Sequence, residues 1–67
     1  MKITFNNSPL ELPLHDATLG WLIGWKGIAA GGMAVAVNNK LVVRSKWDTF
    51  ALHEGDNVVV ISAAFGG

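Results

Sequence analysis

Val58 to Ile61 form the most apolar and most β-branched run of the sequence. Residues of this kind favour strands, and a run without polar alternation predicts a strand that is buried on at least one face. We therefore expect this segment to lie in the centre of a sheet. The remainder of the chain must supply the flanking strands and a layer that covers the sheet.

Two segments near the N-terminus, residues 2–6 and 8–14, alternate apolar and polar residues. The apolar residues that share a face are Ile3 and Phe5 in the first segment and Leu10, Leu12 and Leu14 in the second. Residues 6–8 between them tolerate tight turns, so the two segments predict a β-hairpin. Pro9 and Pro13 cannot donate to a ladder, which places the second strand at a sheet edge. The first strand is the expected neighbour of the central run.

A short helix is predicted after this hairpin. The segment from Asp16 to Thr18 offers an N-cap, for which Thr18 is the better candidate, and Gly27 is expected to end the helix. The residues that follow the cap at helical spacing are Leu19, Leu22, Ile23 and Lys26. Gly20 and Gly24 weaken such a helix by roughly 1 kcal/mol each relative to alanine, so packing against a sheet must stabilise it.

A second hairpin is predicted from residues 33–37 and 41–44, joined by a turn at 38–40. Residues 45–50 are expected to form an irregular link or a single helical turn, with Trp47 in the core or as a lid. The order is hairpin, helix, hairpin, link and strand, with the first and last strands side by side. This order predicts an α+β fold with the β-grasp arrangement of ubiquitin, in which one short helix packs on a mixed sheet of four to five strands.

The composition limits the class of protein. Of the 67 residues, 51% are hydrophobic, which is sufficient for one core, and we expect a single domain over residues 1–67 with a flexible tail at 63–67. A domain of this size buries only about 60% of the surface of its unfolded chain, which leaves little room for an enclosed active site. We therefore do not expect an enzyme.

Charge and cysteine content exclude further classes. Five basic residues balance five acidic ones, so neither nucleic acid nor an anionic membrane is an expected partner. The sequence has no cysteine, which is consistent with the reducing cytoplasm where we expect the protein. Residues 17–37 have the length of a bilayer span, but glycines interrupt them and Lys26 lies near their middle, so no membrane span is expected.

The polar side chains show no catalytic or metal-binding pattern. His15 and His53 have no metal-ligand spacing, so we expect solvated loop histidines and no metal. Gly31-Gly32 lacks the context of a phosphate loop and is more typical of a flexible connection. The carboxylates fall in separate turns or edges, unpaired for acid-base catalysis; they are Glu11, Asp16, Asp48, Glu54 and Asp56.

Trp21 and Trp25 lie four residues apart, on a helix face nearly opposite Leu19, Leu22 and Ile23. If the aliphatic residues pack on the sheet, the two indoles are exposed and suggest a surface for a partner or for self-association. If the helix is rotated, the indoles fill the core instead. The sequence leaves both arrangements open.

Four segments in register resemble the ThiS family, the sulfur carriers of thiamine biosynthesis. These segments are Val35 to Asn38, Val43 to Trp47, Glu54 to Val58, and the terminal Gly66-Gly67. The resemblance covers essentially the whole chain. Val43 stands where the family usually has proline, the helix is unusually rich in Gly and Trp, and Phe65 is bulkier than expected. These departures concern partner specificity more than carrier chemistry.

The resemblance implies that the C-terminal carboxylate of Gly67 is the reactive group. In the family an E1-like adenylyltransferase adenylates it with ATP, a persulfide donor protein supplies sulfur to form a thiocarboxylate, and thiazole synthase receives that sulfur. No stably bound cofactor is implied, because the partner consumes the ATP. Gly66 lacks a Cβ and suits a narrow channel, and Phe65 is a candidate partner contact.

Other functions remain open on the sequence alone. A molybdopterin-type or another dedicated sulfur carrier has the same fold and a different acceptor enzyme. A β-grasp protein modifier or binding module joins its tail to a lysine or leaves it unreacted. Two terminal glycines also occur as a frayed end without function.

Overall fold

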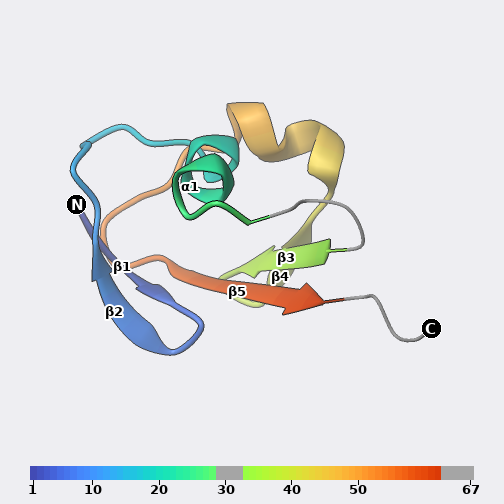
Figure 1. Cartoon of the computed structure of the whole chain (residues 1–67), viewed down its shortest axis with the longest axis horizontal. Coiled ribbons are helices and arrows are strands. Elements are labelled where there is room, and N and C mark those ends of the chain that lie inside the picture. The colour runs from blue at the N-terminus through green and yellow to red at the C-terminus, as the bar shows by residue number, and fades with distance from the viewer. Residues whose placement is uncertain (29–32, 63–67) are drawn as a thin grey trace.

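A computed structural model describes residues 1–28 and 33–62, which form one mixed sheet covered by two helices (Figure 1). The strands are β1 (Lys2–Phe5), β2 (Ser8–Glu11), β3 (Met33–Val37), β4 (Lys40–Val42) and β5 (Asn57–Ser62). The helices are α1 (Leu19–Trp25) and the 3₁₀ helix η1 (Arg44–Thr49).

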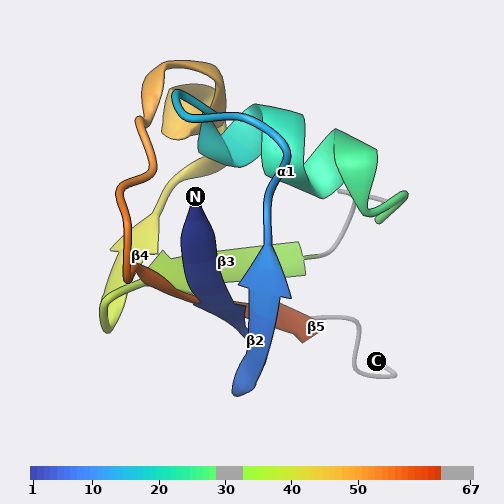
Figure 2. The same ribbon diagram turned by 90° about the vertical axis from the view of Figure 1, so that its left-hand side faces the viewer.

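The five strands lie in the order β2-β1-β5-β3-β4, with β1 and β5 parallel and the other pairs antiparallel. This confirms the predicted β-grasp fold, with the last strand central beside the first and β2 at an edge. Both helices lie on the same side of the sheet (Figure 2). The opposite face carries no helix among the described residues.

The core lies between α1 and the sheet. Leu19, Leu22 and Ile23 are the buried residues of α1, and they pack with Val35 and Val58 of the two central strands. Trp47 of η1 is buried as well, and its indole Nε1 donates to the carbonyl oxygen of Val42 at 2.9 Å. Of the two expected places for Trp47, the core or a lid, the structure confirms the core.

Local sequence explains the boundaries of α1. Thr18 is extended, and its hydroxyl oxygen accepts from the backbone N–H of Trp21 at 3.1 Å, as an N-cap does. Gly27 has φ +69, the left-handed conformation that ends helices, and its N–H donates to the carbonyl oxygen of Gly24. Both predicted helix ends are confirmed.

Three boundaries differ from the sequence expectations. β2 ends at Glu11 rather than near residue 14, because Leu12 already exchanges backbone hydrogen bonds with Met1 and no residue lies opposite Pro13, and Leu14 is exposed rather than inward-facing. β4 covers Lys40–Val42 and not 41–44, since the turn takes only residues 38 and 39 and η1 begins at Arg44. Of the two possibilities for residues 45–50, the helical one is confirmed, although η1 has six residues and is longer than the single turn expected.

Candidate functional site

The end of β5 is the point from which the predicted reactive tail continues. Along β5, β3 pairs with residues Val58 to Ser62, whereas β1 pairs only with Asn57 and Val58. Phe65, Gly66 and Gly67, the predicted tail residues, lie outside the described residues, and so does Gly31-Gly32. The described chain therefore fixes the strand that leads into the tail and the surface around that strand.

The sheet face opposite α1 is aliphatic around β5. Because Val35, Val42 and Val58 point into the core, their neighbours along each strand point to the other face. The ladder places Ala36 beside both Leu41 and Val59, and Ala34 beside Ile61. We call these five residues the open face: Ala34, Ala36, Leu41, Val59 and Ile61. Leu41 is 66% exposed and Ile61 is 52% exposed.

The open face was not predicted from the sequence as a functional surface. A half-exposed strand ordinarily alternates apolar and polar residues, so Val59 and Ile61 are apolar where polar residues are expected. The signal was therefore present in the unbroken run from Val58 to Ile61. A contiguous apolar surface with exposed aliphatic side chains makes this face a candidate site of interaction with another protein.

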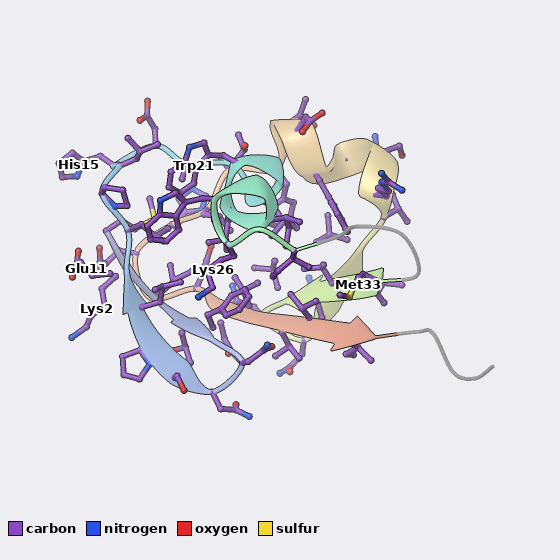
Figure 3. The ribbon with its side chains drawn as sticks, in the orientation of Figure 1. Lys2, Glu11, His15, Trp21, Lys26 and Met33 are labelled. Carbon is purple, nitrogen blue, oxygen red and sulfur yellow. The ribbon has the colours of Figure 1, made fainter. Side chains whose placement is uncertain are left out.

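Trp21 and Trp25 belong to a different surface. Their rings stack, with centroids 5.2 Å apart and planes 15° apart. Trp25 is 46% exposed, whereas Trp21 is half-buried and packs against the core. In Figure 3 the indole of Trp21 extends from α1 toward the side of the β1–β2 hairpin. The pair lies on the α1 side of the sheet and the open face on the other, so the structure does not bring these two surfaces together.

Comparison with known proteins places this architecture in a family. Residues 3–67 match the ThiS family. This chain belongs to the ThiS family. No curated protein matches it.

Two solved structures share the ThiS fold. A crystal structure of a thiamine biosynthesis protein (ThiS) from Geobacter metallireducens matches with a TM-score of 0.88 and 22% identity, over 100% of both chains. An NMR structure of a thiamine biosynthesis protein from the same organism matches with a TM-score of 0.80 and 22% identity, over 100% of this chain and 88% of the other. At this identity the likeness concerns the fold.

Two of the polar side chains considered as candidate ligands, Asp56 and His53, contact each other and have structural roles. The carboxylate of Asp56 is nearly buried and accepts from the backbone N–H of His53 at 2.7 Å and from Nδ2 of Asn38 at 3.0 Å. Nδ1 of His53 lies 3.9 Å from the same carboxylate, and His15 is exposed in a loop. In residues 1–28 and 33–62 no group of three potential metal ligands comes together.

Within the described parts of the chain, neither helix has the length and apolar character needed to cross a bilayer. α1, which lies within the apolar window at residues 17–37, has seven residues.

Proposed function

We propose that this chain is a sulfur carrier of thiamine biosynthesis, in which the carboxylate of Gly67 is the group that is activated and loaded. Membership of the ThiS family over residues 3–67, a range that includes Gly66 and Gly67, is the observation that carries the proposal. The β-grasp fold and its likeness to a thiamine biosynthesis protein support it. The chain acts as a carrier in the cytoplasm, and partner enzymes perform the chemistry.

The chemistry follows from the low reactivity of a carboxylate, whose oxygen must first become a leaving group. An E1-like adenylyltransferase transfers AMP from ATP to the carboxylate of Gly67 and releases pyrophosphate. A terminal sulfur of a persulfide donor then attacks the acyl carbon and displaces AMP. Cleavage of the resulting acyl disulfide by a thiol leaves the thiocarboxylate, which delivers its sulfur to thiazole synthase.

The open face is the surface on which we place the adenylyltransferase. It includes Val59 and Ile61 of β5, the strand that leads into the tail, and all its side chains are aliphatic. A partner docked there holds the domain by its central strand and leaves the tail free to enter a nucleotide site. Gly66 and Gly67 have no Cβ, which suits a narrow channel.

The test is the intact mass of the chain after incubation with its adenylyltransferase, ATP and a persulfide donor. We expect the mass increase that corresponds to replacement of one oxygen by sulfur, and no increase when Gly67 is deleted. An unchanged mass in the complete reaction contradicts the proposal. ATP-dependent attachment of the chain to lysines of other proteins assigns it instead to the protein modifiers.

A second experiment tests the docking surface. Leu41→Asp places a charge on the open face, and Leu14→Asp places the same charge on an exposed leucine elsewhere. We expect Leu41→Asp to raise the KM for adenylation by about tenfold, because a charge in a desolvated apolar contact costs more than 1 kcal/mol. Leu14→Asp should leave the KM unchanged. Equal KM values for both variants contradict docking at the open face.

A further inference from the structure

Among residues 1–28 and 33–62, no strand pairs with the second half of β5 on the side of β1. β1 pairs with β5 through Thr4 opposite Asn57 and Phe5 opposite Val58, and the chain then turns away at Asn6. β3 follows β5 on the other side as far as Ser62. The part of β5 that leads into the tail is therefore supported by a ladder on one side only.

Asn6 extends the support from the β1 side by one more hydrogen bond. Its backbone N–H donates to the carbonyl oxygen of Val58 at 2.9 Å, in regular continuation of the bond from Thr4 to Asp56. In a parallel ladder the carbonyl oxygen of Asn6 would next accept from the N–H of Val60. The backbone of Asn6 has φ +49, which turns that carbonyl out of the ladder. Instead, the side-chain Oδ1 of Asn6 accepts from the N–H of Val60 at 2.8 Å.

The same kind of contact, an asparagine side-chain oxygen that accepts from a backbone N–H of β5, occurs in the second hairpin at the other end of β5. Asn38 also has a positive φ, +52, in a two-residue turn, and its Oδ1 accepts from the N–H of Asn57 at 2.9 Å. Its backbone N–H donates to the carbonyl oxygen of Asn57 at 2.8 Å. The first asparagine of each turn thus holds β5, Asn38 at its start and Asn6 at Val60, near its end.

We propose that Asn6 is a positioning residue for the tail: its carboxamide takes the place of its own backbone carbonyl and fixes the direction in which β5 ends. The proposal rests on the carrier function proposed above. Gly67 lies seven positions after Val60 in the sequence, which corresponds to at most about 25 Å of extended chain. Over that length, a change in the direction of β5 moves the reactive group away from the nucleotide site of a partner docked on the open face.

Matched substitutions separate the effect of losing the Asn6 carboxamide from the effect of changing the turn conformation. Asn6→Gly keeps the left-handed conformation at no steric cost and removes only the side-chain acceptor. Asn7→Gly is the control, because Asn7 has φ +68 in the same turn and the same loss of side chain on substitution. Asn6→Asp restores an acceptor oxygen and tolerates the same conformation. All three variants are compared at a temperature and denaturant concentration at which each is fully folded.

The first readout is hydrogen exchange at the Val60 amide, measured by NMR. We expect about fivefold faster exchange in Asn6→Gly than in Asn7→Gly, the change that corresponds to loss of one hydrogen bond, and a return toward the wild-type rate in Asn6→Asp. Equal rates in the two glycine variants overturn the proposal. This readout does not depend on any carrier activity.

The second readout is ATP–pyrophosphate exchange with the adenylyltransferase. If the substitution lowers the fraction of chains whose tail points in the competent direction, the KM rises by the factor by which that fraction falls. The kcat at saturation is unchanged. We expect a KM about fivefold higher for Asn6→Gly, wild-type values for Asn7→Gly, and recovery in Asn6→Asp. A KM equal to that of Asn7→Gly overturns the positioning role. Absence of exchange with the wild-type chain contradicts the carrier function instead, and the Val60 amide still decides whether Asn6 holds β5.

Discussion

Gly20 and Gly24 lie four residues apart in α1, and the structure gives them opposite surroundings. A Cβ added at Gly24 meets no atom within 4 Å. A Cβ added at Gly20 would collide with Oδ1 of Asp48 and would lie 3.4 Å from the Cα of Asp48. The absent side chain of Gly20 leaves room for the carboxylate of Asp48 from η1, whereas Gly24 faces open space. Alanine should therefore have different effects at the two positions.

The magnitudes follow from helix propensity and steric conflict. Alanine is more favourable than glycine by about 0.8–1.0 kcal/mol in a helix interior, and Gly24 lies one residue before the helix end, so we expect a gain of about 0.5–1 kcal/mol. For a domain of this size this raises the Tm by about 3–7 °C. At Gly20 the same gain is offset by displacement of the Asp48 carboxylate from its rotamer, at about 0.5–1.5 kcal/mol, so the net change is about zero.

Urea and thermal unfolding of both variants measure these differences. The interaction at Gly20 is isolated by a double-mutant cycle with Asp48→Ala, which removes the colliding oxygen. We expect Gly20→Ala to be more favourable by about 1 kcal/mol in that background, and Gly24→Ala to show no such dependence. If Gly20→Ala stabilises the native chain as much as Gly24→Ala does, the Asp48 carboxylate does not oppose a side chain at position 20, and the predicted steric cost is refuted.

Two further substitutions test the polar contacts. Asp56→Ala leaves the His53 N–H and the Asn38 amide without their acceptor, and we expect a loss of about 1–3 kcal/mol in urea unfolding; an unchanged midpoint would show that these bonds contribute nothing net. Trp47→Phe keeps an aromatic ring but removes the donor to the buried carbonyl of Val42, with an expected loss of about 1–2 kcal/mol by thermal unfolding, and stability equal to wild type would contradict this assignment.

The sequence was sufficient for most of the fold because local and global signals agree. The Asn-Asn pairs at 6–7 and 38–39 have positive φ at all four positions, as two-residue hairpin turns require. Thr18 caps α1, and the apolar run at β5 lies in the sheet centre. The exact ends of β2 and β4 were missed, because they depend on the register that places Leu12 opposite Met1 and on the start of η1, and alternation does not show either.

Less of the candidate site than of the fold could be predicted from the sequence. Residue pattern indicated that Val58 to Ile61 is buried on at least one face, but only the register shows that Val59 and Ile61 share the open face with Leu41. The role of the Asn6 carboxamide depends on a contact with Val60, 54 residues away in the sequence. The roles of Gly66 and Gly67 stay predictions, as does partner binding by the tryptophan pair.

β5 has apolar side chains on both of its faces, one in the core and one on the open face. Val58 is fully buried beneath α1 and contributes to the core, while Val59 and Ile61 contribute to the open face. Exposed aliphatic residues favour association between strands and are a solubility liability in a free protein. Polar residues at half-buried Val59 and exposed Ile61 would remove that liability and preserve the core. Retaining aliphatic residues there is physically reasonable if a partner covers them, and the comparison of Leu41→Asp with Leu14→Asp tests that explanation directly.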